Sequence, residues 1–134
     1  MNITQLIDSY KEQMLSDLAE LVAVPSVSAE PDGDAPFGNE CRRALDKFLS
    51  IAQKLCFDTV NYNNYAGSAQ LGSGKPELGI LGHLDVVPVT ADDWATPPFT
   101  MTIKDGKAFG RGTIDDKGPT VAALYAMKAV QDAG

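Results

Sequence analysis

The fold is decided by the stretch Glu77-Leu78-Gly79-Ile80-Leu81-Gly82, which runs directly into His83-Leu84-Asp85. A short, mostly apolar run between turn signals is typical of a strand that is covered on both of its faces. Such a strand needs helices packed above and below its sheet. The stretch therefore predicts an α/β fold with the only histidine of the chain at the end of a buried strand.

Two amphipathic helices are predicted before this strand. The first covers residues 3–22, where apolar side chains recur at three- and four-residue steps, and Asn2 and Gln5 can cap its start. The second runs from about Asn39 to Leu55 and carries an apolar stripe of its own. Residues 26–38 are rich in proline, glycine, aspartate and serine, which favours a loop between the two helices.

The remaining segments predict strands and a final helix. Residues 57–62 alternate like a strand and residues 66–71 are their predicted partner. A hairpin is predicted over residues 99–111, because Asp105-Gly106 is a strong two-residue turn signal. Residues 121–127 are apolar nearly all round, which predicts a buried helix. Together the elements predict an open mixed sheet with helices on its faces.

Composition limits the partners of the chain. The 134 residues include 11 basic and 18 acidic side chains, a formal net charge of −7. Such a balance does not neutralise phosphates, so we expect neither nucleic acid nor an anionic membrane as a partner. The chain opens without a basic, apolar leader, and no run approaches the roughly 18 apolar residues of a membrane span. We therefore expect no signal peptide and no membrane segment.

The two cysteines indicate a reducing compartment. Cys41 and Cys56 fall on one predicted helix, whose rise separates them by about 22 Å. A disulfide needs Cα atoms within about 7 Å. We therefore expect two reduced core residues, which agrees with a cytoplasmic protein.

His83 and Asp85 are the first candidates for chemistry. Side chains at alternate strand positions point to the same face, and open α/β sheets place their ligand sites beyond the carboxyl edge of the strands. A metal-bound imidazole usually donates its second N–H to a carboxylate, which Asp85 offers. The alternative is a buried core histidine that is satisfied by structural partners.

A second candidate is the carboxylate pair Asp115-Asp116, inside the segment Gly110-Arg111-Gly112-Thr113-Ile114-Asp115-Asp116-Lys117-Gly118-Pro119. The N-terminal end of the helix that follows favours negative charge, and two adjacent carboxylates repel unless a cation lies beside them. The alternative is a helix cap with a solvated charge pair. Considered together, imidazole and carboxylate at one sheet edge suit zinc or manganese, as in a two-metal hydrolytic site.

These segments resemble the M20 metallopeptidases, most closely the bacterial dipeptidase branch and its carnosinase-like members. The resemblance covers about residues 78–130, and its motifs are Gly82-His83-Leu84-Asp85-Val86-Val87-Pro88, Trp94, Pro98-Phe99 and Gly110–Gly118. Val24-Pro25-Ser26-Val27-Ser28 also looks like the opening of that family. The resemblance implies that residues 1–134 are the N-terminal part of a zinc-peptidase-like catalytic domain. The rest of that domain and a lid or dimerisation domain would then lie outside this chain.

The resemblance also implies roles for individual residues. His83 would bind one metal ion, and Asp85 would be the catalytic residue that orients its ring. Asp115 would bridge both metal ions, and Asp116 would follow it through a cis peptide bond.

Three further residues take supporting parts. Trp94 and Phe99 would line the mouth of a substrate site, although an ordinary packed aromatic is the alternative for each. Arg111 would support the site by holding the loop before Asp115 or by contacting substrate, and the sequence leaves both open.

Counting ligands indicates that the site is incomplete. A catalytic zinc takes about three protein ligands, so two ions that share Asp115 need about four more, and His83 supplies one. In the family, the general-base glutamate and the remaining ligands come later in the chain. The glutamates present are predicted on helix faces or in loops: Glu12, Glu20, Glu30, Glu40 and Glu77. We therefore expect the chain to be inactive without the C-terminal part of the same protein.

Two functions follow from these observations. The first is hydrolysis of dipeptides or short peptides by a water activated by two divalent ions, with zinc expected and manganese or cobalt as alternatives. Deacetylase or carboxypeptidase action on N-acyl amino acids stays open within the family. The second is a non-catalytic, truncated part of a metal site, whose uncovered sheet edge and apolar last helix favour self-association.

Overall fold

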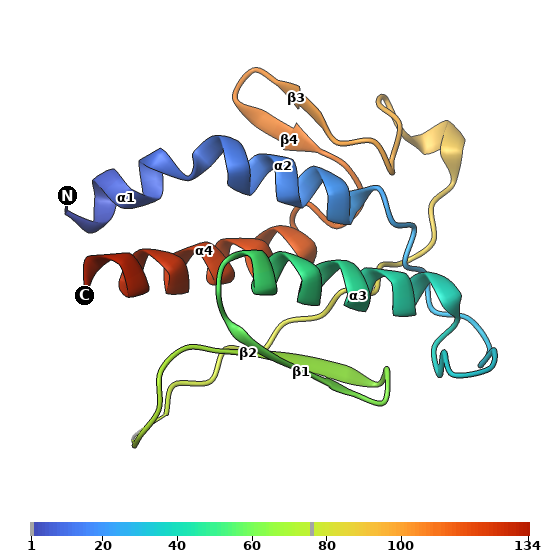
Figure 1. Ribbon diagram of the computed structural model, residues 1–134. Helices are drawn as coiled ribbons and strands as arrows, with labels where there is room; N and C mark the ends of the chain where they lie inside the picture. Colours follow the sequence, from blue (N-terminus) through green and yellow to red (C-terminus); the bar gives the residue numbers. More distant parts are fainter. Residues whose placement is uncertain (1, 76) are drawn as a thin grey trace.

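A computed structural model describes residues 2–75 and 77–134 (Figure 1). Its helices are α1 (Ile3–Ser9), α2 (Lys11–Val22), α3 (Asn39–Lys54) and α4 (Lys117–Ala133), with a short 3₁₀ helix η1 (Ala91–Asp93). Its strands are β1 (Asp58–Tyr62), β2 (Ala66–Gln70), β3 (Thr102–Lys104) and β4 (Lys107–Phe109). The α/β class predicted from the sequence is confirmed.

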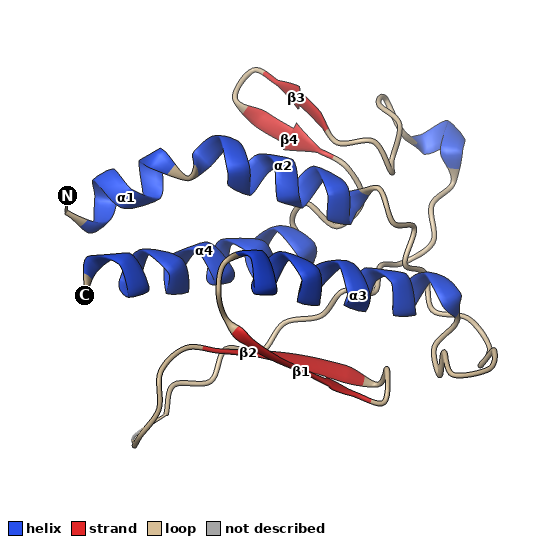
Figure 2. Ribbon diagram, viewed as in Figure 1, coloured by secondary structure: helices blue, strands red, loops and turns tan. Residues whose placement is uncertain are grey.

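The helices form a layer that contains the core. Helix α4 lies beside α1 and α2, α3 packs on α2, and the β1–β2 hairpin covers the other side of α3 (Figure 2). Side chains with no exposed surface come from all three long helices, including Leu21, Val22, Ala44, Ile51 and Val121. Both chain ends lie at the same side of this layer (Figure 1).

The predicted first helix is divided into α1 and α2 at Tyr10. The Ser9 hydroxyl donates to the Leu6 carbonyl at 2.6 Å, a local bond that competes with regular helix formation. The predicted capping pair is confirmed, since the side chains of Asn2 and Gln5 each accept from the other's backbone N–H.

Both predicted hairpins are confirmed. Strands β1 and β2 pair antiparallel, with Asp58 opposite Gln70, and β3 pairs with β4. Asp105 and Gly106 have φ values of 51° and 72°, which the two-residue hairpin turn requires. The strands thus form two separate two-stranded sheets.

The prediction of a buried strand over residues 77–82 is wrong for the described chain. This segment pairs with no strand among the described residues and is drawn as loop (Figure 2). Leu78 is 90 % exposed and Leu81 is 99 % exposed. A strand needs a hydrogen-bonded partner along its edge, and an apolar run in the sequence does not reveal which segment provides it.

Two further expectations need correction. Helix α4 is buried along one face only, through Val121, Leu124 and Tyr125, while Val130 is 55 % exposed. Cys56 lies beyond the end of α3 and is exposed, so it is not a core residue, because the helix ends at Lys54. The two cysteines are free, as expected.

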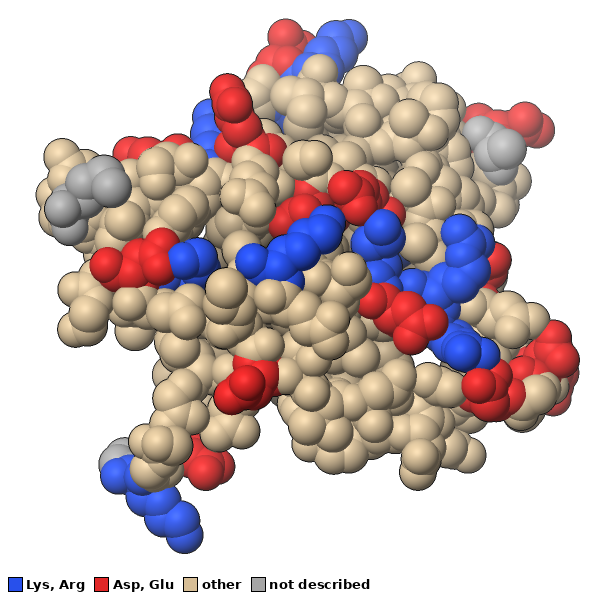
Figure 3. Space-filling view, viewed as in Figure 1, with Lys and Arg blue, Asp and Glu red and all other residues tan. Residues whose placement is uncertain are grey.

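Charged side chains of both signs are mixed over the visible face of the molecule (Figure 3). Exposed ion pairs join Lys47 to Glu20 at 2.8 Å and Arg43 to Glu40 at 2.7 Å. Such exposed pairs each contribute about 0–1 kcal/mol. None of the described helices has both the length and the apolar character needed to cross a membrane.

Candidate functional site

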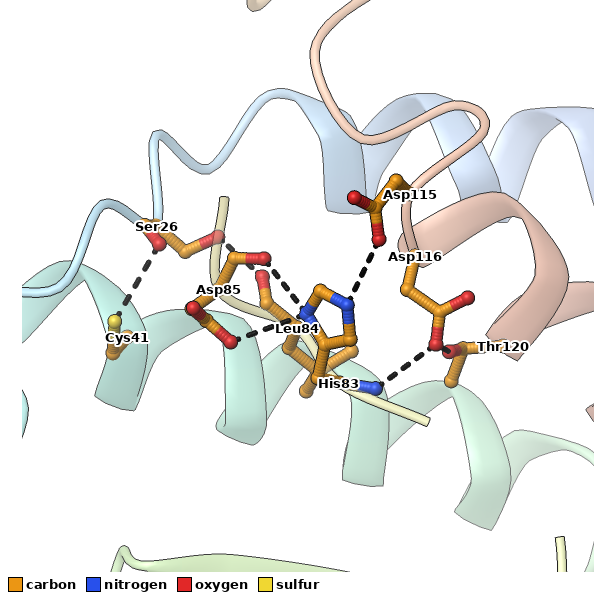
Figure 4. Close-up of polar contacts among 8 residues, drawn as sticks. All are labelled: Ser26, Cys41, His83, Leu84, Asp85, Asp115, Asp116 and Thr120. Atoms are coloured by element: carbon orange, nitrogen blue, oxygen red, sulfur yellow. Dashed lines mark hydrogen bonds and ion pairs between the residues drawn. The ribbon is translucent and has the colours of Figure 1, made fainter. Parts of the chain in front are cut away.

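The His83 ring lies between two carboxylates that come from different parts of the chain (Figure 4). Its Nε2 is 2.9 Å from Asp115 Oδ1, and its Nδ1 is 3.2 Å from Asp85 Oδ1 and 3.1 Å from the Asp85 carbonyl oxygen. Burial lowers the pKa of His83, but the hydrogen bonds with Asp115 and Asp85 outweigh it, so that the pKa is raised above its ordinary value. The predicted approach of residues 83 and 115 is therefore present.

Asp116 fixes the backbone of the same segment. The peptide bond between Asp115 and Asp116 is cis, as expected. The Asp116 carboxylate accepts from the His83 backbone N–H at 3.1 Å and from the Thr120 hydroxyl at 3.2 Å. A Cβ at Gly82 would lie 2.4 Å from Thr120 Oγ1, so only glycine permits this close approach to α4.

The donor atoms fit a divalent metal ion as two of its ligands. Zinc binds histidine nitrogen and carboxylate oxygen at about 2.0–2.2 Å, and a tetrahedral angle places two such atoms about 3.4 Å apart. A small outward movement of the exposed Asp115 carboxylate from its 2.9 Å contact with His83 is sufficient. Within residues 2–75 and 77–134, no three His, Cys, Asp or Glu side chains gather so that they could hold a metal ion.

Known proteins share these segments. Residues 79–134 match the family described as Peptidase family M20/M25/M40. The whole chain is 41 % identical to a Beta-Ala-Xaa dipeptidase of Lactobacillus delbrueckii subsp. lactis and covers 29 % of that protein. The chain is therefore similar to the M20 peptidases, and the matched residues include His83 and Asp115.

Solved dipeptidase structures have the same fold over nearly the entire chain. Human carnosine dipeptidase 1 superposes with a TM-score of 0.71 and 31 % identity, over 96 % of this chain and 31 % of its own. The dipeptidase Dug1p of Saccharomyces cerevisiae gives a TM-score of 0.63 and 25 % identity, over 98 % of this chain and 31 % of its own. This chain thus spans less than a third of the length of these relatives.

Ser26 holds the segment that carries His83, although sequence reasoning did not single it out. The residue is fully buried, and its hydroxyl donates to the Leu84 carbonyl at 2.6 Å. Its own carbonyl accepts from the Val86 N–H at 2.9 Å and from Cys41 Sγ at 3.5 Å. Both Ser26 and Cys41 appear beside the His83 cluster in Figure 4.

Lys117 is the second residue that the sequence did not reveal. Its side chain is fully buried, and Nζ donates to the carbonyls of Leu21 at 2.9 Å and Val24 at 2.7 Å. Burial lowers the pKa of Lys117 to about 8. The available signal was a cation in the first turn of a helix, where the helix dipole disfavours positive charge.

Arg111 and Trp94 lie together, away from the His83 contacts. The Arg111 guanidinium stands over the Trp94 ring at 5.1 Å, and its backbone N–H donates to Pro98. In the part of the chain that the structure describes, no hydrogen bond joins either side chain to His83 or Asp115. Holding the loop before Asp115 is thus the role that the contacts of Arg111 favour.

A cavity of about 640 Å³ adjoins the site and lies among α3, β2 and α4. His83, Asp85, Asp116 and Thr120 contribute to its polar part, and none of its lining residues is a glutamate. The remaining wall is largely apolar and includes Leu45, Phe48, Leu124 and Met127. The site therefore borders a recess of mixed character rather than a flat surface.

Proposed function

We propose that this chain supplies part of the active site of a metal-dependent dipeptidase, which hydrolyses dipeptides or other short peptides. The observation that carries the proposal is the contact of His83 Nε2 with Asp115 Oδ1, with Asp85 on the other ring nitrogen. Relatives whose names state dipeptidase activity support the same substrate class.

Each residue takes a distinct part in this proposal. His83 and Asp115 would hold two divalent ions, with zinc first and manganese or cobalt as alternatives, and Asp115 would be shared between the ions. Bound ions would polarise the scissile carbonyl and lower the pKa of a bound water. Asp85 accepts from Nδ1 and thereby leaves Nε2 for the metal, while Asp116 fixes the His83 backbone.

The general base would come from outside this chain. No glutamate lines the cavity beside His83 or contacts its ring among the described residues. The 134 residues alone are then a weak metal binder without turnover. The free thiols of Cys41 and Cys56 support a reducing, cytoplasmic location.

A chimera tests the proposed function. Residues 1–134 replace the matching part of the Lactobacillus dipeptidase, and dipeptides are compared with N-acyl amino acids as substrates. We expect turnover of dipeptides that His83→Ala and Asp115→Asn each abolish, whereas Glu40→Gln, an exposed change on α3, keeps it. A preference for N-acyl amino acids would favour the deacetylase alternative, and full activity of His83→Ala would refute the metal assignment.

A further inference from the structure

We propose that Ser26 and Lys117 are positioning residues that set the separation of His83 and Asp115, through the short segment Val24-Pro25-Ser26. The meaning of that separation for catalysis rests on the proposed function. The positioning itself involves only contacts within this chain.

The first anchor holds the His83 side of the site. The Ser26 hydroxyl donates to the Leu84 carbonyl and its carbonyl accepts from the Val86 N–H. These two bonds fix the backbone on both sides of Asp85, the residue that contacts His83 Nδ1. Because Ser26 has no exposed surface, water cannot replace its hydroxyl without rearrangement of the site.

The second anchor holds the Asp115 side. Lys117 follows directly after Asp115 and Asp116, and its Nζ reaches the carbonyls of Leu21 and Val24. Leu21 lies in the last turn of α2 and Val24 just beyond its C-terminal end, where the helix dipole favours a positive charge. In the described residues no carboxylate forms an ion pair with Lys117, so the helix end is its sole anchor there.

Both anchors meet on three consecutive residues. The Val24 carbonyl accepts a hydrogen bond from the Lys117 ammonium. Two residues later, the Ser26 hydroxyl donates to Leu84 in the segment that carries His83. The Ser26 N–H donates to the Val24 carbonyl at 2.9 Å, and the proline between them fixes one backbone angle. The segment is therefore short and stiff, so a displacement at one anchor is transmitted to the other. We call these three residues the bracket.

The bracket explains how segments so distant in the sequence reach a fixed spacing. Apart from the contact of His83 with Asp115 itself, Asp116 ties the two sides through the His83 N–H, and this backbone bond does not fix the orientation of the ring. Misplacement of a catalytic group by about 1 Å can reduce a rate by about 100-fold. Residues that orient metal ligands change metal affinity by about 10- to 100-fold.

Nitrogen resonances of the single histidine test the proposal in the 134-residue chain without any metal. Asp115→Asn should shift the His83 Nε2 resonance in the parent chain, because the two groups touch. When Asp115→Asn is introduced into the Ser26→Ala or the Lys117→Met variant, we expect the change in the Nε2 resonance to be at least twofold smaller than in the parent chain. In the Ser26→Thr variant the change should return to the parent size.

The matched control is Tyr125→Phe, which removes a buried hydrogen bond to Asp17 in the same core but leaves the bracket intact. In the Tyr125→Phe variant, Asp115→Asn should change the His83 Nε2 resonance as much as in the parent chain, although the variant is less stable. If Ser26→Ala folds and retains the full response, the proposal is wrong. If Lys117→Met does not fold, the comparison of Ser26→Ala with Ser26→Thr decides alone.

A titration with cobalt ions gives a second readout. We expect about tenfold weaker cobalt binding by Ser26→Ala than by Tyr125→Phe. Equal affinities would contradict the positioning role. A chimera without peptidase activity would refute the proposed function. A smaller Nε2 change in the Ser26→Ala variant would still establish the positioning role of the bracket, so the two failures are distinguishable.

Discussion

Single buried polar side chains connect parts of the chain that are far apart in sequence. The Tyr125 hydroxyl on α4 donates to Asp17 on α2 at 2.6 Å, while Lys117 and Ser26 bind backbone carbonyls. A buried group that loses its partner costs about 1–3 kcal/mol, more than the bond itself contributes. These few residues therefore have a large influence on how α2, α4 and the His83 segment are oriented.

Tyr125→Phe should lower the free energy of unfolding by about 1–3 kcal/mol, because the Asp17 carboxylate keeps its burial and loses its donor. Urea unfolding measures the change. Tyr62→Phe is the matched control, since Tyr62 is exposed and its hydroxyl forms a surface contact with Ser68. The control should change the free energy by less than about 0.5 kcal/mol. Equal losses of unfolding free energy in Tyr125→Phe and Tyr62→Phe would contradict a special contribution from the buried hydrogen bond.

Gly82→Ala should displace the His83 segment from α4. The new Cβ would lie 2.4 Å from Thr120 Oγ1, whereas a Cβ at Gly79 would meet nothing within 4 Å. We expect a loss of about 1–3 kcal/mol for Gly82→Ala and little change for Gly79→Ala, by urea unfolding. Adding Thr120→Ala to Gly82→Ala should recover much of the loss. A double variant no more stable than the single one would exclude this steric cause.

At the scale of elements, Tyr10, which lies between α1 and α2, ties this junction to the end of α4. The Tyr10 hydroxyl and the Lys128 ammonium both donate to the Asp132 carboxylate, and the Tyr10 ring packs on Tyr125 at 5.9 Å. These hydrogen bonds lower the pKa of Asp132, first through Lys128 and then through Tyr10. The contact between the two chain ends should therefore depend on pH.

Asp132→Asn should remove this dependence. The folded pKa of Asp132 lies below the ordinary value of 3.8, so the carboxylate stabilises the fold above that value and loses the effect as pH falls further. At neutral pH the variant should unfold at lower urea concentration than the parent, and the two midpoints should converge in strong acid. Asp58→Asn on β1 serves as control. A constant difference between the parent and the Asp132→Asn midpoints across the acid range would contradict the assignment.

Local signals predicted most elements, and long-range contacts explain what they missed. The Asp105-Gly106 turn and the Asn2–Gln5 cap depend on neighbouring residues, so their sequences were sufficient. Residues 77–82 were predicted as a strand because apolar character does not specify a pairing partner. Ser26 and Lys117 were missed because they bind backbone carbonyls, which every residue possesses. The approach of His83 and Asp115, in contrast, was predicted from a strand-edge argument although that strand does not form.

At the scale of the whole molecule, the helices bury a common core, but residues 77–82 beside the site are exposed and unpaired among the described residues. Leu78 and Leu81 are almost fully exposed, and their backbone pairs with no strand among the described residues. Exposed apolar side chains on an unpaired segment favour pairing with another chain. The same surface lies next to the cavity that borders His83 and is lined in part by Ile80 and Leu81.

The 134-residue chain should therefore self-associate as its concentration rises, and sedimentation can measure the equilibrium. A double variant, Leu78→Lys with Leu81→Lys, should shift it towards monomer, because charge at both positions opposes pairing between copies. The matched control is Ile103→Lys on β3, which is also exposed but whose strand is already paired with β4. It should leave the equilibrium nearly unchanged. A parent chain that stays monomeric at every concentration, or a control that disrupts association equally, would show that residues 77–82 are not the contact.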